Sequence, residues 1–113
     1  MDIQTQEIDT RGIKFIAKDG DTEIGRAYLY LIHNDLHEEP AGYLEDMFVD
    51  EAYRGKKIGS QLLEAVLHKA KEIGCYKLVG TSRYGKEQVH EWYERFGFEK
   101  SGFAFRMDLS DNT

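Results

Sequence analysis

The stretch RGKKIGS, residues 54–60, combines residue types that can bind an anion. Gly55 and Gly59 flank Lys56 and Lys57, and apolar residues at helical spacing follow from Ile58. The first N–H groups of a helix have no partner within the helix, and the macrodipole adds about half a positive charge there. Glycine also lets the backbone approach a phosphate closely. The stretch therefore predicts an anion site at a helix start; the alternative is an ordinary helix start with solvated lysines.

A second candidate for chemistry is the carboxylate pair Glu45 and Asp46, which interrupts the apolar run GYLEDMFVD. A carboxylate can accept a proton from a reacting group. Adjacent residues of a strand point to opposite faces, so only one of the two should face a given site. The alternative is that both carboxylates lie at the surface.

Two kinds of periodicity indicate the elements that position these residues. The first half alternates as strands do, and one run is apolar on both faces, which predicts a strand buried on both. Residues 58–73 and 86–97 repeat at helical spacing, with Gly74 and Gly97 where the helices should end. The predicted strands are IKFIAKDG, TEIGRAYLYLIHN (the run apolar on both faces), GYLEDMFVD, CYKLVGTS and FEKSGFAFRMDL, and MDIQTQEID is a candidate for a further short strand.

This order of elements predicts an α/β (α+β) fold. Helices connect some of the strands, so part of the sheet should be parallel and the sheet as a whole mixed. A length of 113 residues and a hydrophobic share of 41% suit a single domain over residues 1–113.

Composition indicates which compartment and which partners suit the chain. The polar N-terminal segment lacks the basic start and apolar run of a signal peptide, and no apolar stretch approaches the roughly 20 residues of a membrane span. Cys75 is the only cysteine, which favours a reducing cytoplasm. A net charge of −6 argues against nucleic-acid binding and suits small cationic partners. We therefore predict neither a membrane nor a nucleic-acid partner.

Metal binding is the weaker reading of the histidines. His33 and His37 lie beside Glu38 and Glu39, but the loop is polar and no supporting spacing occurs elsewhere, so no metal is predicted. His90 is expected at the surface of its helix.

Two longer stretches, LEDMFVDEAYRGKKIGSQLLEAVL and VHEWYERFGFEKSGF, carry a family resemblance. Together they resemble the GNAT superfamily of acetyl-CoA-dependent N-acetyltransferases. The family's acetyl-CoA motif is Arg or Gln, two residues, Gly, one residue, then Gly or Ala. Arg54 and Gly59 match its ends, and Lys57 stands where the middle glycine is expected. WYERFGF, residues 92–98, follows the family's aromatic-Tyr-Glu-Lys-Leu-Gly-Phe stretch, and the resemblance covers residues 24–108.

The resemblance implies a GNAT-like mixed sheet, splayed at its centre and flanked by helices, with acetyl-CoA between the two halves. The pantetheine arm would pair with the end of the third strand. The pyrophosphate would rest on the backbone amides of Gly55 to Ser60. At Lys57 the backbone would need ordinary helical angles, or the phosphate would sit slightly differently. The implied cofactor-binding residues are Met47, Phe48, Val49, Arg54, Gly55, Lys56, Lys57, Ile58, Gly59 and Ser60.

For catalysis, the resemblance implies direct attack of a primary amine on acetyl-CoA in a ternary complex. A Leu-Glu-Asp triplet occurs on this strand in the polyamine acetyltransferases, where the Glu binds the amine or relays its proton. The resemblance therefore implies that Glu45, rather than Asp46, is the catalytic carboxylate. Tyr93 stands where the family has its general acid, although its spacing alone would make it a core residue. A backbone amide near Met47 or Phe48, on a bulged strand, would polarise the carbonyl.

The chain departs from the family before its first predicted strand. Members usually carry two helices between their first and second strands that wall the acceptor site, and the segment before IKFIAKDG is too short for them. The predicted function is an N-acetyltransferase for a small polyamine-like amine, or for a protein lysine or N-terminus. The alternative is a module that binds acetyl-CoA or a protein with little turnover. An uncovered sheet face predicts a homodimer, through Tyr28, Leu29, Tyr30, Leu31, Leu36 and Tyr43.

Overall fold

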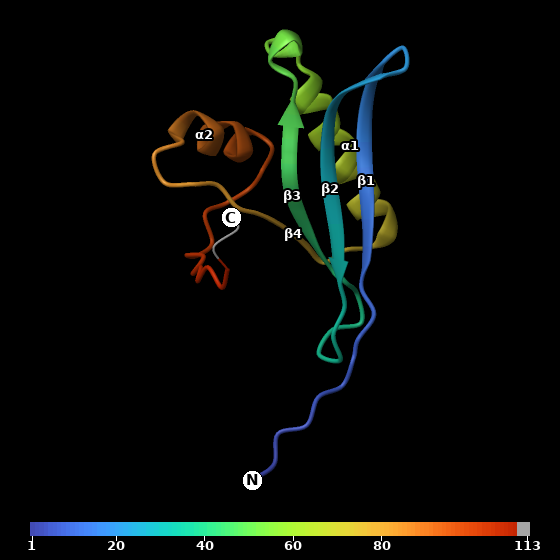
Figure 1. Cartoon of the computed structure of the whole chain (residues 1–113), viewed down its shortest axis with the longest axis vertical. Coiled ribbons are helices and arrows are strands. Elements are labelled where there is room, and N and C mark those ends of the chain that lie inside the picture. The colour runs from blue at the N-terminus through green and yellow to red at the C-terminus, as the bar shows by residue number, and fades with distance from the viewer. Residues whose placement is uncertain (111–113) are drawn as a thin grey trace. The chain divides into compact units, whose positions relative to one another are not determined.

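A four-stranded sheet forms the first of two units in the computed structural model, which describes residues 1–110 (Figure 1). Its strands lie in the order β1 (Arg11–Asp19), β2 (Thr22–Ile32), β3 (Ala41–Val49) and β4 (Lys77–Gly80). The first three pair antiparallel, and β4 runs parallel to β3 after helix α1 (Ile58–Ile73). The mixed sheet is therefore confirmed. This unit spans Met1–Gly80 and the second begins at Thr81, and a single domain over residues 1–113 stays a prediction.

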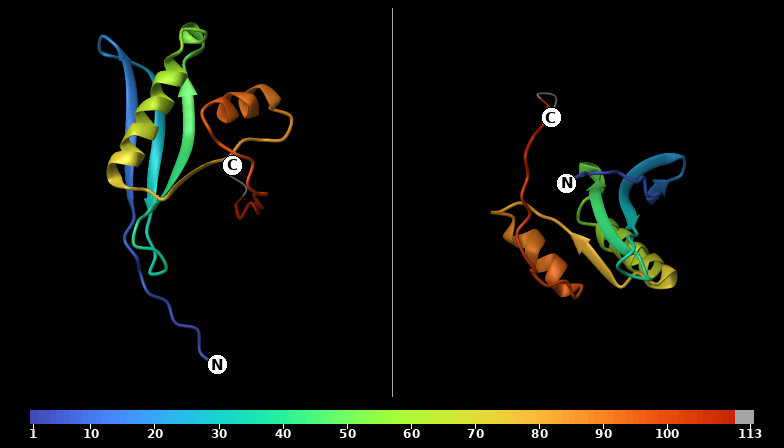
Figure 2. Two further views of the ribbon diagram at one scale, coloured as in Figure 1. Left: turned by 180° about the vertical axis from the view of Figure 1, so that it is seen from behind. Right: turned by 90° about the horizontal axis from the view of Figure 1, so that it is seen from below.

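Helix α1 covers one face of the sheet and builds the core with it (Figure 2). Its bounds are those predicted from its periodicity. The helix ends where Gly74 takes left-handed angles, with φ of 94°, and donates its N–H to the carbonyls of Ala70 and Lys71. The buried apolar side chains of this unit come from β2, β3 and α1: Ile24, Ala27, Leu29, Leu31, Ala41, Leu44, Leu62, Leu63, Val66 and Ala70.

Strand β2 buries only one of its two rows of side chains. Leu29 is 0% and Leu31 6% exposed, whereas Tyr30 is 39% exposed and Ile32 45%. The prediction that this strand is buried on both faces was wrong, because α1 covers one face of the sheet. Leu29 and Leu31 were also wrong as members of an uncovered dimer patch, since both lie in the core.

The opposite face of β2 and β3 carries aromatic and charged side chains. Residues directly opposite one another on paired strands share a face. Tyr30 pairs with Tyr43 and Tyr28 with Glu45, and beyond them Arg26 pairs with Phe48. We call the surface made by Arg26, Tyr28, Tyr30, Tyr43, Glu45 and Phe48 the open face.

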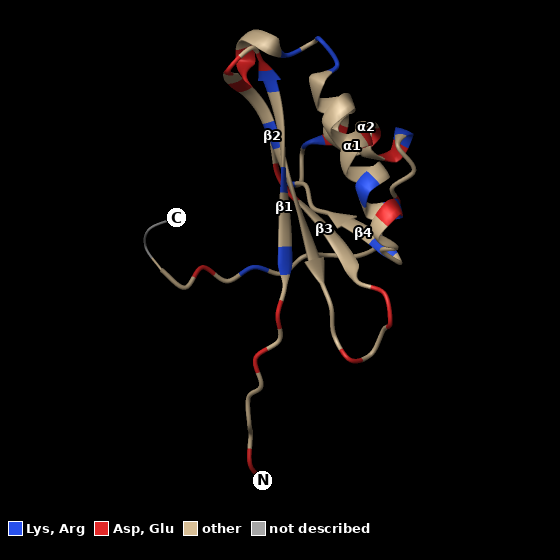
Figure 3. Cartoon of the chain, turned by 90° about the vertical axis from the view of Figure 1, so that its right-hand side faces the viewer, with Lys and Arg blue, Asp and Glu red and all other residues tan. Residues whose placement is uncertain are grey.

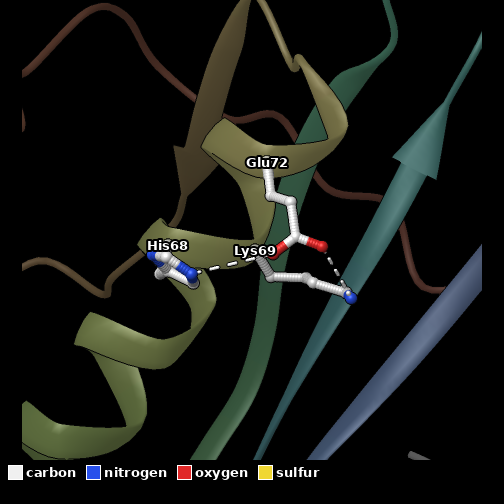
Figure 4. A network of polar contacts seen from close by, with 3 residues as sticks. All are labelled: His68, Lys69 and Glu72. Carbon is white, nitrogen blue, oxygen red and sulfur yellow. Dashed lines mark hydrogen bonds and ion pairs between the residues drawn. The ribbon is translucent and has the colours of Figure 1, made fainter.

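The outer side of α1 carries a small polar network (Figure 4). The Lys69 ammonium lies 3.4 Å from one carboxylate oxygen of Glu72, and His68 Nε2 lies 3.7 Å from the other. Side chains three and four residues apart are neighbours on a helix surface, and such exposed pairs stabilise it by only a few tenths of a kcal/mol. The network marks the solvent side of the helix.

The second unit contains helix α2 (Glu87–Arg95), which confirms the second predicted helix. Gly97 follows it with φ of 99°. The predicted last strand, FEKSGFAFRMDL, was wrong, because no neighbouring strand pairs with the part of the chain from Phe98 to Leu109. A strand needs such a partner for its backbone groups, and Phe103 and Phe105 are instead exposed.

Residues 1–10 form neither helix nor strand, so the candidate strand in MDIQTQEID was also wrong. No helix precedes β1 within the described part of the chain, as the sequence led us to expect. Among residues 1–110, neither helix has the length and apolar character needed to cross a bilayer.

Candidate active site

The end of β3 is bulged. Tyr28 pairs with Glu45, yet Arg26 pairs with Phe48, so Asp46 and Met47 together lie opposite the single residue Ala27. Asp46 has φ of 49°, in the left-handed region that few residues other than glycine adopt. A bulge bends the strand and leaves one residue without ladder partners. The bulged strand implied by the family resemblance is thus present.

The bulge changes which side chains share a face. Regular alternation would place Glu45 and Phe48 on opposite faces, because they are three residues apart. The extra residue brings both onto the open face, opposite Tyr28 and Arg26. Glu45 is half-buried there, while Asp46 is exposed at the bulge.

Beyond Leu44, strand β3 also loses its neighbour β4. The parallel pairing runs from Ala41–Lys77 to Leu44–Gly80 and stops there. The edge of β3 that faced β4 is therefore unpaired by β4 from Glu45 to Val49. These are the residues for which the family resemblance implied main-chain pairing with a pantetheine arm, Met47, Phe48 and Val49 among them.

A short helix and an arginine connect β3 to residues 54–57, which we call the basic turn. The 3₁₀ helix η1 (Glu51–Tyr53) follows β3 directly, and Asp50 donates its N–H to the Ile24 carbonyl at 2.8 Å. Arg54 Nε donates to the Val49 carbonyl at 3.0 Å, and its guanidinium carbon lies 5.8 Å from the centre of the Phe48 ring. Arg54 thereby fastens the turn to the end of β3.

Tyr53 ties the same turn to the hairpin between β1 and β2. Its hydroxyl donates to Asp19 Oδ2 at 2.6 Å, and the Lys56 ammonium lies 5.3 Å from its ring centre. The hydrogen bond to the Asp19 carboxylate raises the pKa of Tyr53, because loss of the proton would remove that bond and place two negative charges together. No local sequence pattern indicates this contact, since the two residues are 34 positions apart.

The basic turn takes two left-handed residues, Gly55 with φ of 81° and Lys57 with φ of 65°. A Cβ on Gly55 would meet nothing within 4 Å, so its conformation rather than space requires glycine. Lys57 does not adopt ordinary helical angles, so of the two alternatives expected at this position only the second, a slightly different place for the phosphate, stays a prediction. Its backbone takes the conformation that a glycine would adopt readily, even though it carries a side chain.

We expect Lys57→Gly to stabilise the protein by about 1 kcal/mol, because left-handed angles cost a residue with a side chain about that much. Lys56→Gly is the matched control. Lys56 lacks a positive φ, so glycine there should only add freedom to the unfolded chain and destabilise. Urea unfolding of both variants measures the difference. Equal destabilisation by the two changes would contradict the assignment.

The basic segment, blue in Figure 3, leads directly into the first turn of α1. Lys57 is its N-cap and supplies no side-chain hydrogen bond to the helix. Gln61 donates its N–H to the Lys57 carbonyl, and Ile58, Gly59 and Ser60 lie between these two residues in the first turn. Helix N–H groups, the macrodipole and two nearby lysines together favour an anion at this position.

Tyr93 lies on α2, in the second unit. Its ring centre is 5.2 Å from that of Trp92 and 5.2 Å from that of Phe98, the latter edge to face. The packing expected from its helical spacing is therefore real, and the half-buried ring is held by aromatic neighbours. Its role as an acid stays a prediction.

The histidines have structural partners. His33 Nε2 donates to the Glu38 carbonyl at 2.8 Å, and His90 Nε2 donates to the Arg83 carbonyl at 2.9 Å, since a carbonyl can only accept. Within residues 1–110, His, Cys, Asp and Glu side chains nowhere gather in threes in a way that could hold a metal ion.

Comparison with known proteins identifies the family of this chain. The model of the acetyltransferase (GNAT) family matches residues 2–98. Aminoglycoside N(6')-acetyltransferase type 1 of Stenotrophomonas maltophilia is 34% identical over 108 residues, which cover 89% of this chain and 70% of that protein. A probable glucosamine 6-phosphate N-acetyltransferase of Drosophila melanogaster is 36% identical over 76 residues, which cover 66% of this chain. The chain spans only 33% of the length of that relative.

A solved structure has a similar fold. An acetyltransferase from Trypanosoma brucei has a TM-score of 0.78 and 26% identity, over 87% of this chain and 69% of that one. The fold and these matches define the class as that of acyl-CoA-dependent N-acetyltransferases. The chain belongs to the GNAT acetyltransferase family.

Proposed function

We propose that this chain transfers the acetyl group of acetyl-CoA to a primary amine by direct attack within a ternary complex. One observation carries the proposal. Strand β3 loses its β4 partner and bulges, and then leads through η1 into a basic, glycine-bearing turn at the start of a helix. An unpaired strand edge can hold an extended amide chain, and the helix start can hold its phosphates.

The residues fit acetyl-CoA in this order along the chain. The backbone of Met47, Phe48 and Val49 offers main-chain partners to the pantetheine amides. The turn from Arg54 to Lys57 and the amides of Ile58, Gly59 and Ser60 offer positive charge and N–H donors to the pyrophosphate. Acetyl-CoA supplies an activated thioester. A backbone N–H at the bulge, on Met47 or Phe48, would stabilise charge on the carbonyl oxygen.

The acceptor side of the proposal rests on Glu45. An amine must be neutral to attack, and neutralising a lysine-like amine of pKa about 10.4 at pH 7 costs about 4–5 kcal/mol. Glu45 lies on the open face beside the bulge and would take the amine's proton directly or through a water. Tyr93 would return a proton to the departing thiolate.

Thiol release from acetyl-CoA across a panel of primary amines tests the proposed function. Steady release with one amine supports the enzyme. Tight CoA binding by calorimetry without release would favour the alternative, a binding module with a degenerate acceptor site. Mass spectrometry of the product should show one added acetyl group on nitrogen.

Glu45→Gln should slow turnover by about 10²-fold, the lower end of the range for a positioned acid or base. The loss should grow as pH falls, because less free amine is then present and removal of the proton matters more. Glu39→Gln, on an exposed loop, is the matched control. A ratio of variant to wild-type rate that stays flat with pH would count against Glu45 as the base.

The homodimer stays a prediction, now resting on Tyr28, Tyr30, Tyr43 and Leu36. Light scattering at micromolar concentration measures it, and we expect twice the 13.1 kDa chain mass. A mass near that of one chain would refute a stable dimer. We also propose a reducing cytoplasm as its setting, because burial raises the pKa of the Cys75 thiol and the chain offers it no disulfide partner.

A further inference from the structure

The basic turn is held in place by polar contacts rather than by burial. Residues 54–57 are exposed, none of the residues of η1 is buried, and a Cβ on Gly55 would meet nothing within 4 Å. Gly55 and Lys57 both adopt left-handed angles, which are unfavourable for a residue with a side chain such as Lys57. A turn of this kind keeps one conformation only if surrounding contacts define it.

Hydrogen bonds join η1 and its flanking residues to each of the three antiparallel strands. The bonds to β2 and β3 come from the backbone of Asp50 and the side chain of Arg54. The bond to β1 comes from the Tyr53 hydroxyl, which donates at 2.6 Å to Asp19, the last residue of that strand. This last bond is made by two side chains, so a substitution can remove it and leave the backbone unchanged.

Tyr53 also contacts a cation of the turn. The Lys56 ammonium lies 5.3 Å from the centre of the Tyr53 ring, within the range over which a ring face attracts a cation. The hydroxyl therefore holds the ring against the end of β1, and the ring in turn orients Lys56. Through Tyr53, the position of a positive charge in the turn depends on the sheet.

We propose that Tyr53 and Asp19 are positioning residues for the phosphates of CoA, because their hydrogen bond holds the basic turn, and Lys56 with it, in the conformation that receives them. The inference rests on the proposed cofactor site, and neither residue needs to contact the ligand. When a turn is ordered before binding, less free energy is lost in ordering it on binding. Loss of the contact should therefore weaken CoA binding and leave the acetyl-transfer step unchanged.

The charge of Asp19 allows a test by the sign of the effect. A carboxylate near an anion site repels phosphate, so if Asp19 acted by its charge alone, its removal would strengthen CoA binding. If Asp19 acts by holding Tyr53, its removal weakens CoA binding. The two roles therefore predict opposite changes in affinity for Asp19→Ala.

Calorimetric titration with CoA measures these changes. Tyr53→Phe keeps the ring and loses the hydroxyl, whereas Asp19→Ala loses the acceptor. Each should weaken CoA binding about 3- to 10-fold, the range for one hydrogen bond. The double variant should lose no more than either single variant, because both changes remove the same bond. Asp21→Ala is the matched control, since it removes an equal charge from the same hairpin and should keep or slightly raise the affinity.

Further readouts separate positioning from general damage to the fold. Pantetheine carries no phosphate and should bind every variant as it binds the wild type. Hydrogen exchange of the amides of residues 54–58 should be faster in Tyr53→Phe and Asp19→Ala but not in Asp21→Ala. Unchanged CoA affinity in Tyr53→Phe, tighter CoA binding by Asp19→Ala, or an equal loss of pantetheine binding would overturn the proposal.

The outcome is separable from that of the proposed function. In the acetylation assay, the KM for acetyl-CoA should rise in Tyr53→Phe and Asp19→Ala by the same factor as the Kd, at constant kcat. Weaker CoA binding by these variants without thiol release from the wild type would leave the positioning role standing and remove the enzyme. Thiol release with an unchanged KM for acetyl-CoA in both variants would leave the enzyme standing and remove the positioning role. A wild type that does not bind CoA would remove both.

Discussion

Replacement of Tyr93 by phenylalanine should lower kcat by about 10²–10⁴-fold, the usual contribution of a positioned acid. The change removes only the hydroxyl. Because Tyr93 packs edge to face on Phe98 and beside Trp92, a phenylalanine ring can keep both contacts. The affinity for CoA should therefore hardly change, which calorimetry can measure beside the turnover assay.

Tyr84→Phe is the natural control for this variant. Tyr84 belongs to the same unit and is 83% exposed, so loss of its hydroxyl should leave kcat at the wild-type value. If Tyr93→Phe turns over at the wild-type rate as well, Tyr93 is a packing residue of α2 and the acid must be sought elsewhere.

Gly59→Glu should nearly abolish CoA binding in a protein that still folds. Gly59 is the second residue of α1, where the pyrophosphate is proposed to bind, and a carboxylate there would repel phosphate and fill its space. The helix itself should accept the change, because acidic residues in a first turn interact favourably with the macrodipole. Calorimetric titration with CoA gives the affinity, and the thermal unfolding midpoint reports on the fold.

Gln61→Glu adds the same charge two residues later. Two residues are about 200° around a helix, so this exposed position points away from Gly59. We expect its affinity for CoA to stay within a few-fold of wild type. Undiminished affinity in Gly59→Glu would remove the helix start from the cofactor site.

Local periodicity was enough to predict most elements. The bounds of α1 followed from the spacing of its apolar residues and from Gly74, and β1 ended at the Asp19-Gly20 turn. The mixed sheet followed from the order of strands and helices. The basic turn could be recognised because glycine, lysine and a helix start are close together in sequence.

Features that depend on pairing could not be predicted in this way. The bulge at Asp46 and Met47 exists only relative to β2, and alternation alone placed Glu45 and Phe48 on opposite faces. The contact between Tyr53 and Asp19 joins distant positions. The last predicted strand had a suitable pattern, but a pattern cannot supply the neighbour that a strand needs.

At its bulge, strand β3 has two residues opposite one residue of β2, which is one more than regular pairing requires. A chain without Asp46 would pair continuously and would lose a left-handed residue that has a side chain, so the sheet would gain regularity. Engineering this protein for heat resistance by straightening its sheet would then remove the bulge that positions the backbone N–H of Met47 or Phe48, which is proposed to stabilise charge on the carbonyl oxygen. In this strand, thermostability and catalysis make opposite demands on the bulge.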